Sequence, residues 1–103
     1  MVKIVKISKE EAVRRLGYVP EDKRFWCQDG KVMKNLVELR EALDNMSEET
    51  FRYHSREERN DFSIWVRDVV GDESLAGDLR KAKSRAQSSK AVAERISFLQ
   101  SRT

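Results

Sequence analysis

Five residues that are favourable at the start of a helix divide this chain into short segments. They are Ser8, Asn35, Ser47, Asn60 and Asp72. The side-chain oxygen of such a residue accepts a hydrogen bond from a backbone amide in the first helical turn, which otherwise has no partner. Apolar residues follow these positions mostly at spacings of three and four, as on one face of a helix. The chain is therefore predicted to form several short amphipathic helices.

The first of these helices is predicted to run from Ser8 to about Leu16. Ser8 and Glu11 match a capping box, in which each side chain accepts a hydrogen bond from the other residue's backbone amide. Gly17 then supplies a left-handed stop, and Pro20 prevents the helix from continuing.

A second well-marked helix is predicted over residues 61–70, with Gly71 just past its end. Its buried face is expected to carry Phe62, Trp65, Val66 and Val69. Its outward face then carries Ser63, Ile64, Arg67 and Asp68. A DNA-recognition helix needs polar or basic residues facing outward near its start. One arginine beside an aspartate does not meet that need, so a helix-turn-helix protein is not the favoured interpretation.

An aromatic-rich run and an Asp-Gly pair predict a β-hairpin over about residues 24–34. Asp29 and Gly30 separate two apolar runs, and such a pair favours a type I′ turn, which needs two positive φ values. Adjacent strand residues face opposite sides, so one of Phe25 and Trp26 should be buried and the other exposed. A lone hairpin is marginal in water, so it must pack on helices or gain a third strand from residues 1–7.

The C-terminal segment has apolar residues on one seam, with a thin stretch in its middle. The seam consists of Leu75, Leu79, Ala82, Ala86, Ala93 and Ile96. Either one long helix runs to about Leu99, or two helices meet near Ser88. The expected fold class is α+β and mainly helical, with the hairpin packed on four to five helices. Residues 1–80 are expected to form the globular domain, and residues 81–103 a basic helical extension of the same domain.

Composition limits the class of protein. A chain of 103 residues can bury one core. Cys27 is the only cysteine, which excludes an intramolecular disulfide and suits a reducing compartment. We find no signal-peptide core, lipidation motif or apolar run long enough to span a membrane. The protein is therefore expected to be soluble and cytoplasmic, with no membrane partner.

The net positive charge comes from the C-terminal segment. The whole chain has a net charge of +3, but residues 80–103 carry seven Lys or Arg and one acid. The basic residues that could follow one helical stripe are Lys81, Lys83, Arg85, Lys90 and Arg95. Such a stripe could neutralise phosphates and bind nucleic acid without sequence preference. Only Phe98 offers stacking there, and a solvated charged face is the more ordinary explanation.

One stretch of the chain resembles a known family. The matching pieces are Asp29-Gly30-Lys31, Asn35-Leu36-x-x-Leu39, Ala42-Leu43-x-x-Met46, Phe51-x-Tyr53-His54, Asn60-Asp61-Phe62-x-x-Trp65 and Gly71-Asp72-x-x-Leu75-Ala76. Over about residues 25–79 the sequence resembles a family of small archaeal and bacterial proteins that share a domain of unknown function. The resemblance implies a prokaryotic source, a shared fold and a shared ligand or partner surface. It brings no known activity.

The only histidine, His54, is the natural candidate for a general acid or base, with Asp61 to orient it. The alternative is that His54 caps its own helix or bonds to the following loop. One histidine and one cysteine cannot complete a structural zinc site. The spacing of Glu57, Glu58 and Asp61 does not match a calcium-binding loop. We therefore expect no metal, no cofactor and, on balance, no enzymatic activity.

The remaining candidates point to a binding surface. Whichever hairpin aromatic faces outward is a candidate contact, and Trp26 is taken as that residue. Asn60 is expected to cap its helix, with a recognition pair of Asn60 and His54 as the alternative. The predicted partner-binding residues are Trp26, His54, Asn60 and Asp61. The leading hypothesis is a non-enzymatic adaptor that recognises another protein or a second copy of itself. The alternative is a nucleic-acid-associated protein that uses the C-terminal helix.

Overall fold

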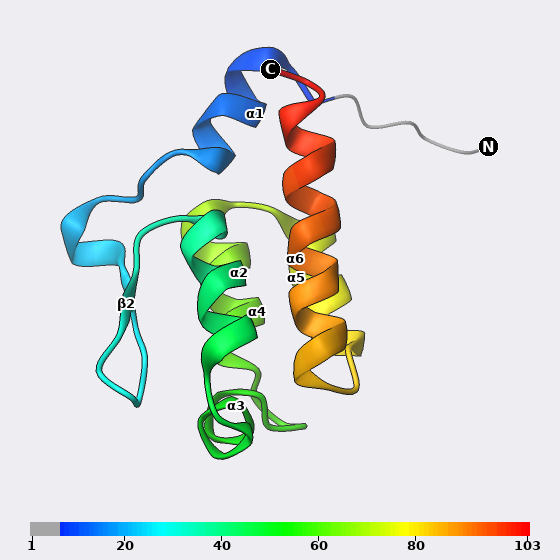
Figure 1. Cartoon of the computed structure of the whole chain (residues 1–103). Coiled ribbons are helices and arrows are strands. Elements are labelled where there is room, and N and C mark those ends of the chain that lie inside the picture. Colours follow the sequence, from blue (N-terminus) through cyan, green and yellow to red (C-terminus); the bar gives the residue numbers. More distant parts are fainter. Residues whose placement is uncertain (1–6) are drawn as a thin grey trace.

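The computed structural model describes residues 7–103 and shows a mainly helical α+β fold, as predicted (Figure 1). The α-helices are α1 (Lys9–Leu16), α2 (Leu36–Asn45), α3 (Glu48–His54), α4 (Asp61–Trp65), α5 (Glu73–Lys81) and α6 (Arg85–Gln100). A 3₁₀ turn η1 (Glu21–Lys23) precedes strands β1 (Phe25–Trp26) and β2 (Val32–Met33), and a π-helical turn η2 (Val66–Val70) continues α4. The hairpin lies on one side of α2, and α6 lies on the other (Figure 1).

The predicted helix starts are confirmed. Each of the five capping side chains accepts a hydrogen bond from the amide three residues later, at 2.9–3.1 Å. A sixth cap, Ser84, begins α6 in the same way, with Gln87 N–H as donor. The capping box of α1 is half formed, because the Glu11 carboxylate pairs with Arg14 and Arg15 instead of returning to Ser8.

The two glycines predicted to end helices adopt different backbone conformations. Gly71 is left-handed, with φ of 80°, and its N–H donates to the Val66 carbonyl, as expected of a helix end. Gly17 is extended, with φ of −77°, so the left-handed stop predicted there is wrong. Its N–H still donates to the carbonyls of Val13 and Arg14, which closes the last turn without a left-handed residue.

The π-helical turn η2 changes which residues of the predicted 61–70 helix are buried. A π turn holds more residues than an α turn, so the buried face moves along the sequence. Val70 is therefore buried and Val69 only half-buried, where the α-helical spacing had placed Val69 on the buried face. Ser63, expected outward, is also buried, and its hydroxyl donates to the Ala76 carbonyl at 2.7 Å.

The hairpin is confirmed, but its turn differs from the predicted one. Phe25 pairs with Met33 and Trp26 with Val32. Gly30 has φ of 92° and no other residue of the loop has a positive φ, so the turn is not type I′. Gly30 N–H donates to the Cys27 carbonyl, as in a three-residue loop with a type I turn and a left-handed glycine. The first six residues of the proposed third strand lie outside the described residues.

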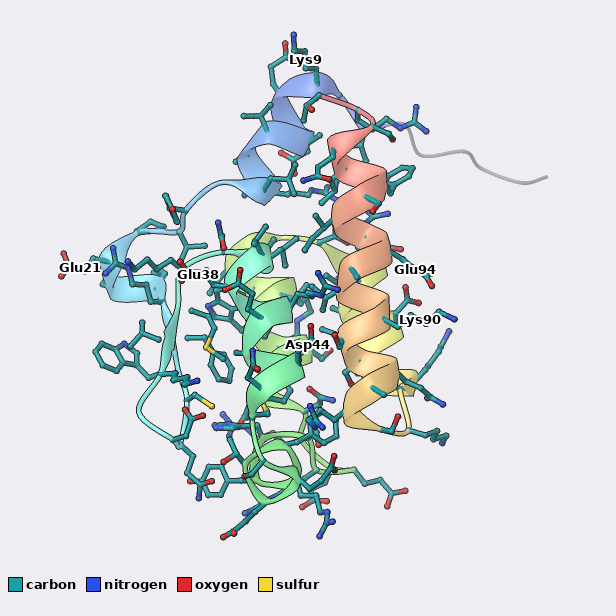
Figure 2. All side chains as sticks on the ribbon, in the orientation of Figure 1. Lys9, Glu21, Glu38, Asp44, Lys90 and Glu94 are labelled. Carbon is teal, nitrogen blue, oxygen red and sulfur yellow. The ribbon has the colours of Figure 1, made fainter. Side chains whose placement is uncertain are left out.

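Helix α6 forms one wall of the core. The C-terminal segment is two helices, as in one of the two alternatives, but the break is at residues 82–84 and not near Ser88. The buried residues of α6 are Ser88, Ser89, Val92, Ile96 and Leu99. The predicted seam was wrong at Ala86, which is exposed, because Ser88 and Ser89 are buried with their hydroxyls bonded to the Ser84 carbonyl and the Asp44 carboxylate. Figure 2 places Asp44 on α2, beside α6. The thin stretch of the predicted seam is therefore covered by the rest of the chain and gives no evidence for a partner on this face.

Candidate functional site

A small pocket on the hairpin side of the molecule contains most of the predicted partner-binding residues. Its volume is about 350 Å³. Its apolar lining comes from β1, α4 and η2: Phe25, Trp26, Ile64, Trp65 and Val69. His54, Arg59, Asp61 and Asp68 supply its polar lining. We refer to it as the Trp26 pocket.

The two hairpin aromatics are divided as strand geometry predicts. Phe25 is 7% exposed and its ring lies 5.2 Å from the His54 ring and 5.3 Å from the Phe62 ring, centroid to centroid. Trp26 is 72% exposed. The sequence placed one aromatic on each face, and the structure shows that Trp26 is the outward one. Its indole is available at the edge of an apolar pocket.

The chain on both sides of Trp26 is held by buried side chains. Before β1, the indole N–H of Trp65 donates to the Lys23 carbonyl at 2.8 Å. After β1, the backbone N–H of Gln28 donates to Nε2 of His54 at 3.0 Å. Hydrogen bonds therefore fix the strand that carries Trp26 to the helical core at both ends.

His54 and Asp61 meet, as the enzyme hypothesis requires, but in a structural arrangement. Nδ1 of His54 lies 3.0 Å from Oδ2 of Asp61, whose other oxygen accepts from Arg59 at 3.0 Å. Because Nε2 accepts from the Gln28 amide, the proton of the neutral ring must be on Nδ1 and is donated to Asp61. Both ring nitrogens are then occupied and the side chain is 7% exposed, so no lone pair is presented to a substrate.

Substitution of His54 is expected to destabilise the protein. His54→Ala would leave the Gln28 amide unpartnered and open a cavity beside Phe25 and Phe62, so the free energy of unfolding should fall by about 2–4 kcal/mol. Tyr53→Ala, in the same helix but half exposed, should cost about 1 kcal/mol or less. Denaturant titration measures both. Nitrogen NMR shifts of the imidazole should show the Nδ1–H tautomer, and an Nε2–H tautomer would contradict this arrangement.

Asn60 serves the helix start and does not form an exposed pair with His54. Its Oδ1 accepts from the Ser63 amide at 3.0 Å, and its Nδ2 donates to the Leu79 carbonyl at 3.3 Å. The capping interpretation is confirmed, and Asn60 also ties the start of α4 to α5. It lines a second depression, next to the Trp26 pocket.

This second depression is a basic groove of about 510 Å³. The 55–59 loop, the outer face of α4 and the region where α5 ends line it. Its charged residues are Arg56, Arg59, Arg67, Arg80, Lys83, Glu57 and Glu58. Sequence reasoning considered these residues in separate segments, with Lys83 assigned to the basic helical stripe, and missed the groove. The sequence feature that could have revealed the groove is Ile64, an apolar residue on the predicted outward face of its helix. Its side chain borders both the groove and the Trp26 pocket.

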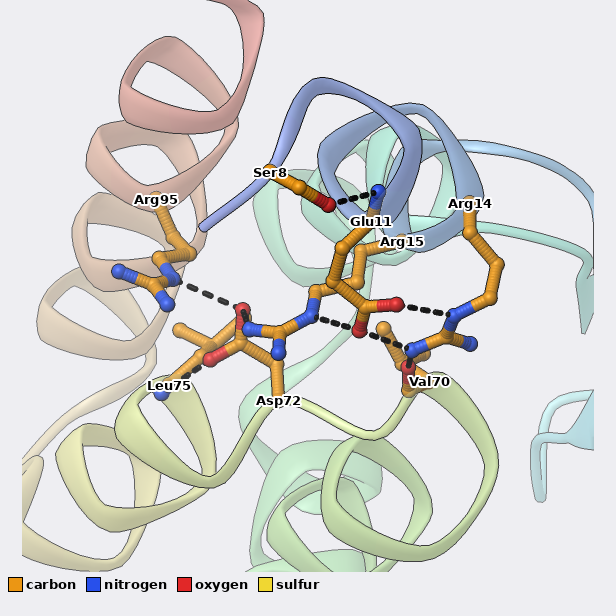
Figure 3. Close-up of polar contacts among 8 residues, drawn as sticks. All are labelled: Ser8, Glu11, Arg14, Arg15, Val70, Asp72, Leu75 and Arg95. Carbon is orange, nitrogen blue, oxygen red and sulfur yellow. Dashed lines mark hydrogen bonds and ion pairs between the residues drawn. The ribbon is translucent and has the colours of Figure 1, made fainter. Parts of the chain in front are cut away.

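The basic residues predicted to bind nucleic acid do not form a continuous stripe. Arg95 donates to the buried carboxylate of Asp72 at 2.8 Å, and Arg15 of α1 donates to the same oxygen at 3.2 Å (Figure 3). Arg85 donates to the carbonyls of Leu43 and Asp44 at the end of α2.

The three lysines of that set remain on the surface. Lys81 and Lys83 are exposed. Lys90 lies beside Glu94 on the outer face of α6, with 3.9 Å between Nζ and the carboxylate (Figure 2). Two of the five predicted nucleic-acid-binding residues, Arg85 and Arg95, are thus used inside the fold.

Other chemistry finds little support in the described part of the chain. Among residues 7–103 no group of three or more His, Cys, Asp or Glu side chains is placed to hold a metal ion. Burial raises the pKa of the Cys27 thiol, which disfavours the nucleophilic thiolate. No helix in the described range has both the length and the apolar character needed to cross a membrane.

Comparison with known proteins gives no match. No protein-family model, curated protein or solved structure is significantly similar to this chain.

Proposed function

We propose that this protein is a non-enzymatic module that binds another protein through the Trp26 pocket. The observation that carries the proposal is Trp26 itself, 72% exposed at the edge of an apolar pocket. Large apolar side chains scattered on a surface are ordinary, but here Ile64 and Val69 are half-buried in the same pocket. An apolar side chain of the partner would be covered by Trp26 on one side and by these residues on the other.

The rigidity of the strand favours binding. Tryptophan, tyrosine and arginine are enriched among the residues that dominate binding energy, and Trp26 and Arg59 both border the pocket. Ordering a side chain or loop on binding costs free energy, which a surface already in its binding conformation avoids. The Lys23 carbonyl accepts from Trp65 and the Gln28 amide donates to His54, and these hydrogen bonds hold the backbone on either side of Trp26 before any partner arrives. His54 thus acts through the hairpin and is a positioning residue.

The proposal includes two further expectations from the sequence. We propose that the chain is related to the family that it resembles over residues 25–79, a range that contains every residue lining the Trp26 pocket, and that the family shares this surface. We also propose the cytoplasm as the compartment, because the single cysteine is buried and forms no disulfide.

Capture from a lysate of the source organism tests the proposal with a matched control. Tyr18 is 73% exposed and does not line the pocket, so Tyr18→Ala removes an exposed aromatic elsewhere. Both Trp26→Ala and Tyr18→Ala should change the free energy of unfolding by no more than about 0.5 kcal/mol. The wild type and Tyr18→Ala should capture the same protein in similar amounts, and Trp26→Ala should capture at least tenfold less of it. Equal recovery with all three proteins would contradict the proposal. Recovery of only the chain itself would identify self-association instead.

A further inference from the structure

The basic groove has more positive charge than the carboxylates around it balance, although Arg80 also donates to the Ser63 hydroxyl at 3.3 Å. Five cationic side chains line it against two glutamates. Arg59 and Arg67 are paired with the neighbouring carboxylates of Asp61 and Asp68. Within residues 7–103 the other three cations, Arg56, Arg80 and Lys83, make no salt bridge. Cations collected in one depression raise the local concentration of anions.

The groove is continuous with the Trp26 pocket. Arg59, Asp61 and Ile64 connect them: Arg59 and Ile64 line both depressions, and Asp61 adjoins Asn60 of the groove. A chain that entered the pocket with one side chain could therefore continue into the groove, toward the three cations that make no salt bridge.

We propose that the partner contributes an extended segment with an apolar side chain for the Trp26 pocket and acidic residues for the basic groove. This inference rests on the proposed function, because it assigns both depressions to one partner. The acidic side chains lie against Arg56 of the 55–59 loop and against Arg80 and Lys83 near the end of α5. Carboxylates paired with arginine and lysine at the rim accelerate association and fix the orientation of the segment.

An acidic peptide fits the groove better than a nucleic acid does. Single-stranded nucleic acids need several aromatic faces on which successive bases stack. Among the described residues, Trp26 is the one exposed aromatic residue that lines the two depressions, and the groove itself is lined by none. Tyr53 beside the groove is half exposed, but the Arg56 guanidinium lies over its ring at 5.4 Å from the centroid. Glu57 and Glu58 interrupt the positive lining, and Arg85 and Arg95 are engaged inside the fold, so no long basic track continues along α6. A short acidic segment needs only the local cations.

An NMR titration with a hexaglutamate peptide tests this assignment on the full chain. Backbone amides of residues 55–59 and 80–83 should shift, and affinity should fall as salt is raised. The double variant Arg56→Gln/Lys83→Gln should weaken binding about fivefold. Arg52→Gln/Lys81→Gln makes the same change in net charge outside the groove, at two exposed residues, and should bind as the wild type does.

Two further probes separate the alternatives. Hexathymidylate DNA, with a comparable charge, should bind more weakly than hexaglutamate, and tighter binding would overturn the proposal in favour of a nucleic acid. If the two double variants lose the same affinity for hexaglutamate, binding depends only on net charge and the proposal is wrong. The absence of any backbone amide shift would also contradict it.

Adding a Leu-Gly extension at either end of hexaglutamate should increase its affinity for the wild type but not for Trp26→Ala. If neither extended peptide gains affinity, the two depressions do not share a ligand and the inference fails. The proposed function would still hold in that case if capture of a protein from the lysate depends on Trp26.

Discussion

A chain that ends after Arg80 is expected not to fold. Residues 81–103 contain α6, which packs along α2 and also contacts α1 and α5. Its fully buried Val92 and Leu99 and nearly buried Ile96 each contribute about 1.5–3 kcal/mol by burial. Their sum is comparable to the total stability of about 5–15 kcal/mol expected of a domain of this size. The loss of Arg95 would also leave the buried Asp72 with one cation fewer.

Circular dichroism and urea titration of the truncated chain measure this effect. The truncated chain should show no cooperative unfolding transition. A chain that ends after Gln100 is the control, because residues 101–103 are exposed and lie beyond α6. It should unfold as the full chain does. A cooperative transition in the 1–80 chain would show that α6 is dispensable for the core. If the expected result holds, truncation cannot be used to assign binding to the basic tail, and substitutions are needed.

Loss of the charge on Asp72 is expected to be the most destabilising single change in a polar residue. Asp72 is fully buried, caps α5 and accepts from Arg15 and Arg95, so it joins α1, α5 and α6 (Figure 3). Asp72→Asn keeps a capping oxygen but leaves two half-buried arginines without this carboxylate, and should reduce the free energy of unfolding by about 3–5 kcal/mol. Asp72→Ala should cost about 1 kcal/mol more, because the cap is also lost.

Asp68→Asn is the matched control for the Asp72 variants. Asp68 forms an exposed pair with Arg67, and removing its charge should change the free energy of unfolding by no more than about 0.5–1 kcal/mol. Denaturant titration compares the variants. A cost below about 1 kcal/mol for Asp72→Asn would contradict the assigned role.

The contribution of Asp72 should also depend on pH. Burial by itself would raise the pKa of Asp72, but the hydrogen bond from Arg95, the Leu75 amide and the charge of Arg15 together hold it below the ordinary value of 3.8. The unfolded chain then binds a proton at higher pH than the folded chain does. The stabilisation is therefore complete above 3.8 and is lost as the pH falls through the lower pKa of the folded state. The difference in stability between the wild type and Asp72→Asn should be constant near neutrality and shrink below 3.8.

Local signals in the sequence predicted the helices and the hairpin. Side-chain caps act within three residues, so Asn35 and Asp72 could be placed without knowledge of the fold. Some of what failed is local, such as the left-handed stop at Gly17 and the type I′ turn of the hairpin, and some depends on contacts between helices. Ser88 and Ser89 are buried because their hydroxyls bond to the preceding turn and to α2. A seam drawn through the apolar residues alone leaves such serines out. The π turn at Val66–Val70 likewise has no periodic signature.

The candidate site was predicted in part. Strand alternation required one exposed hairpin aromatic, and the choice of Trp26 depended on what covers Phe25. His54 and Asp61 were paired correctly, but the Gln28 amide that occupies the second ring nitrogen comes from a segment 26 residues away. The basic groove was missed for the same reason, because its lining combines three separate segments of the chain.

Photo-crosslinking from the pocket tests the central claim most directly. Replacing Trp26 with p-benzoylphenylalanine keeps a large aromatic at the exposed position and reacts only with a molecule in contact with it. The same replacement at Tyr18, equally exposed but outside the pocket, is the control. In cells of the source organism, position 26 should yield one dominant protein adduct that position 18 does not give. No adduct from position 26, or the same set of adducts from both positions, would contradict a protein-binding function for the Trp26 pocket.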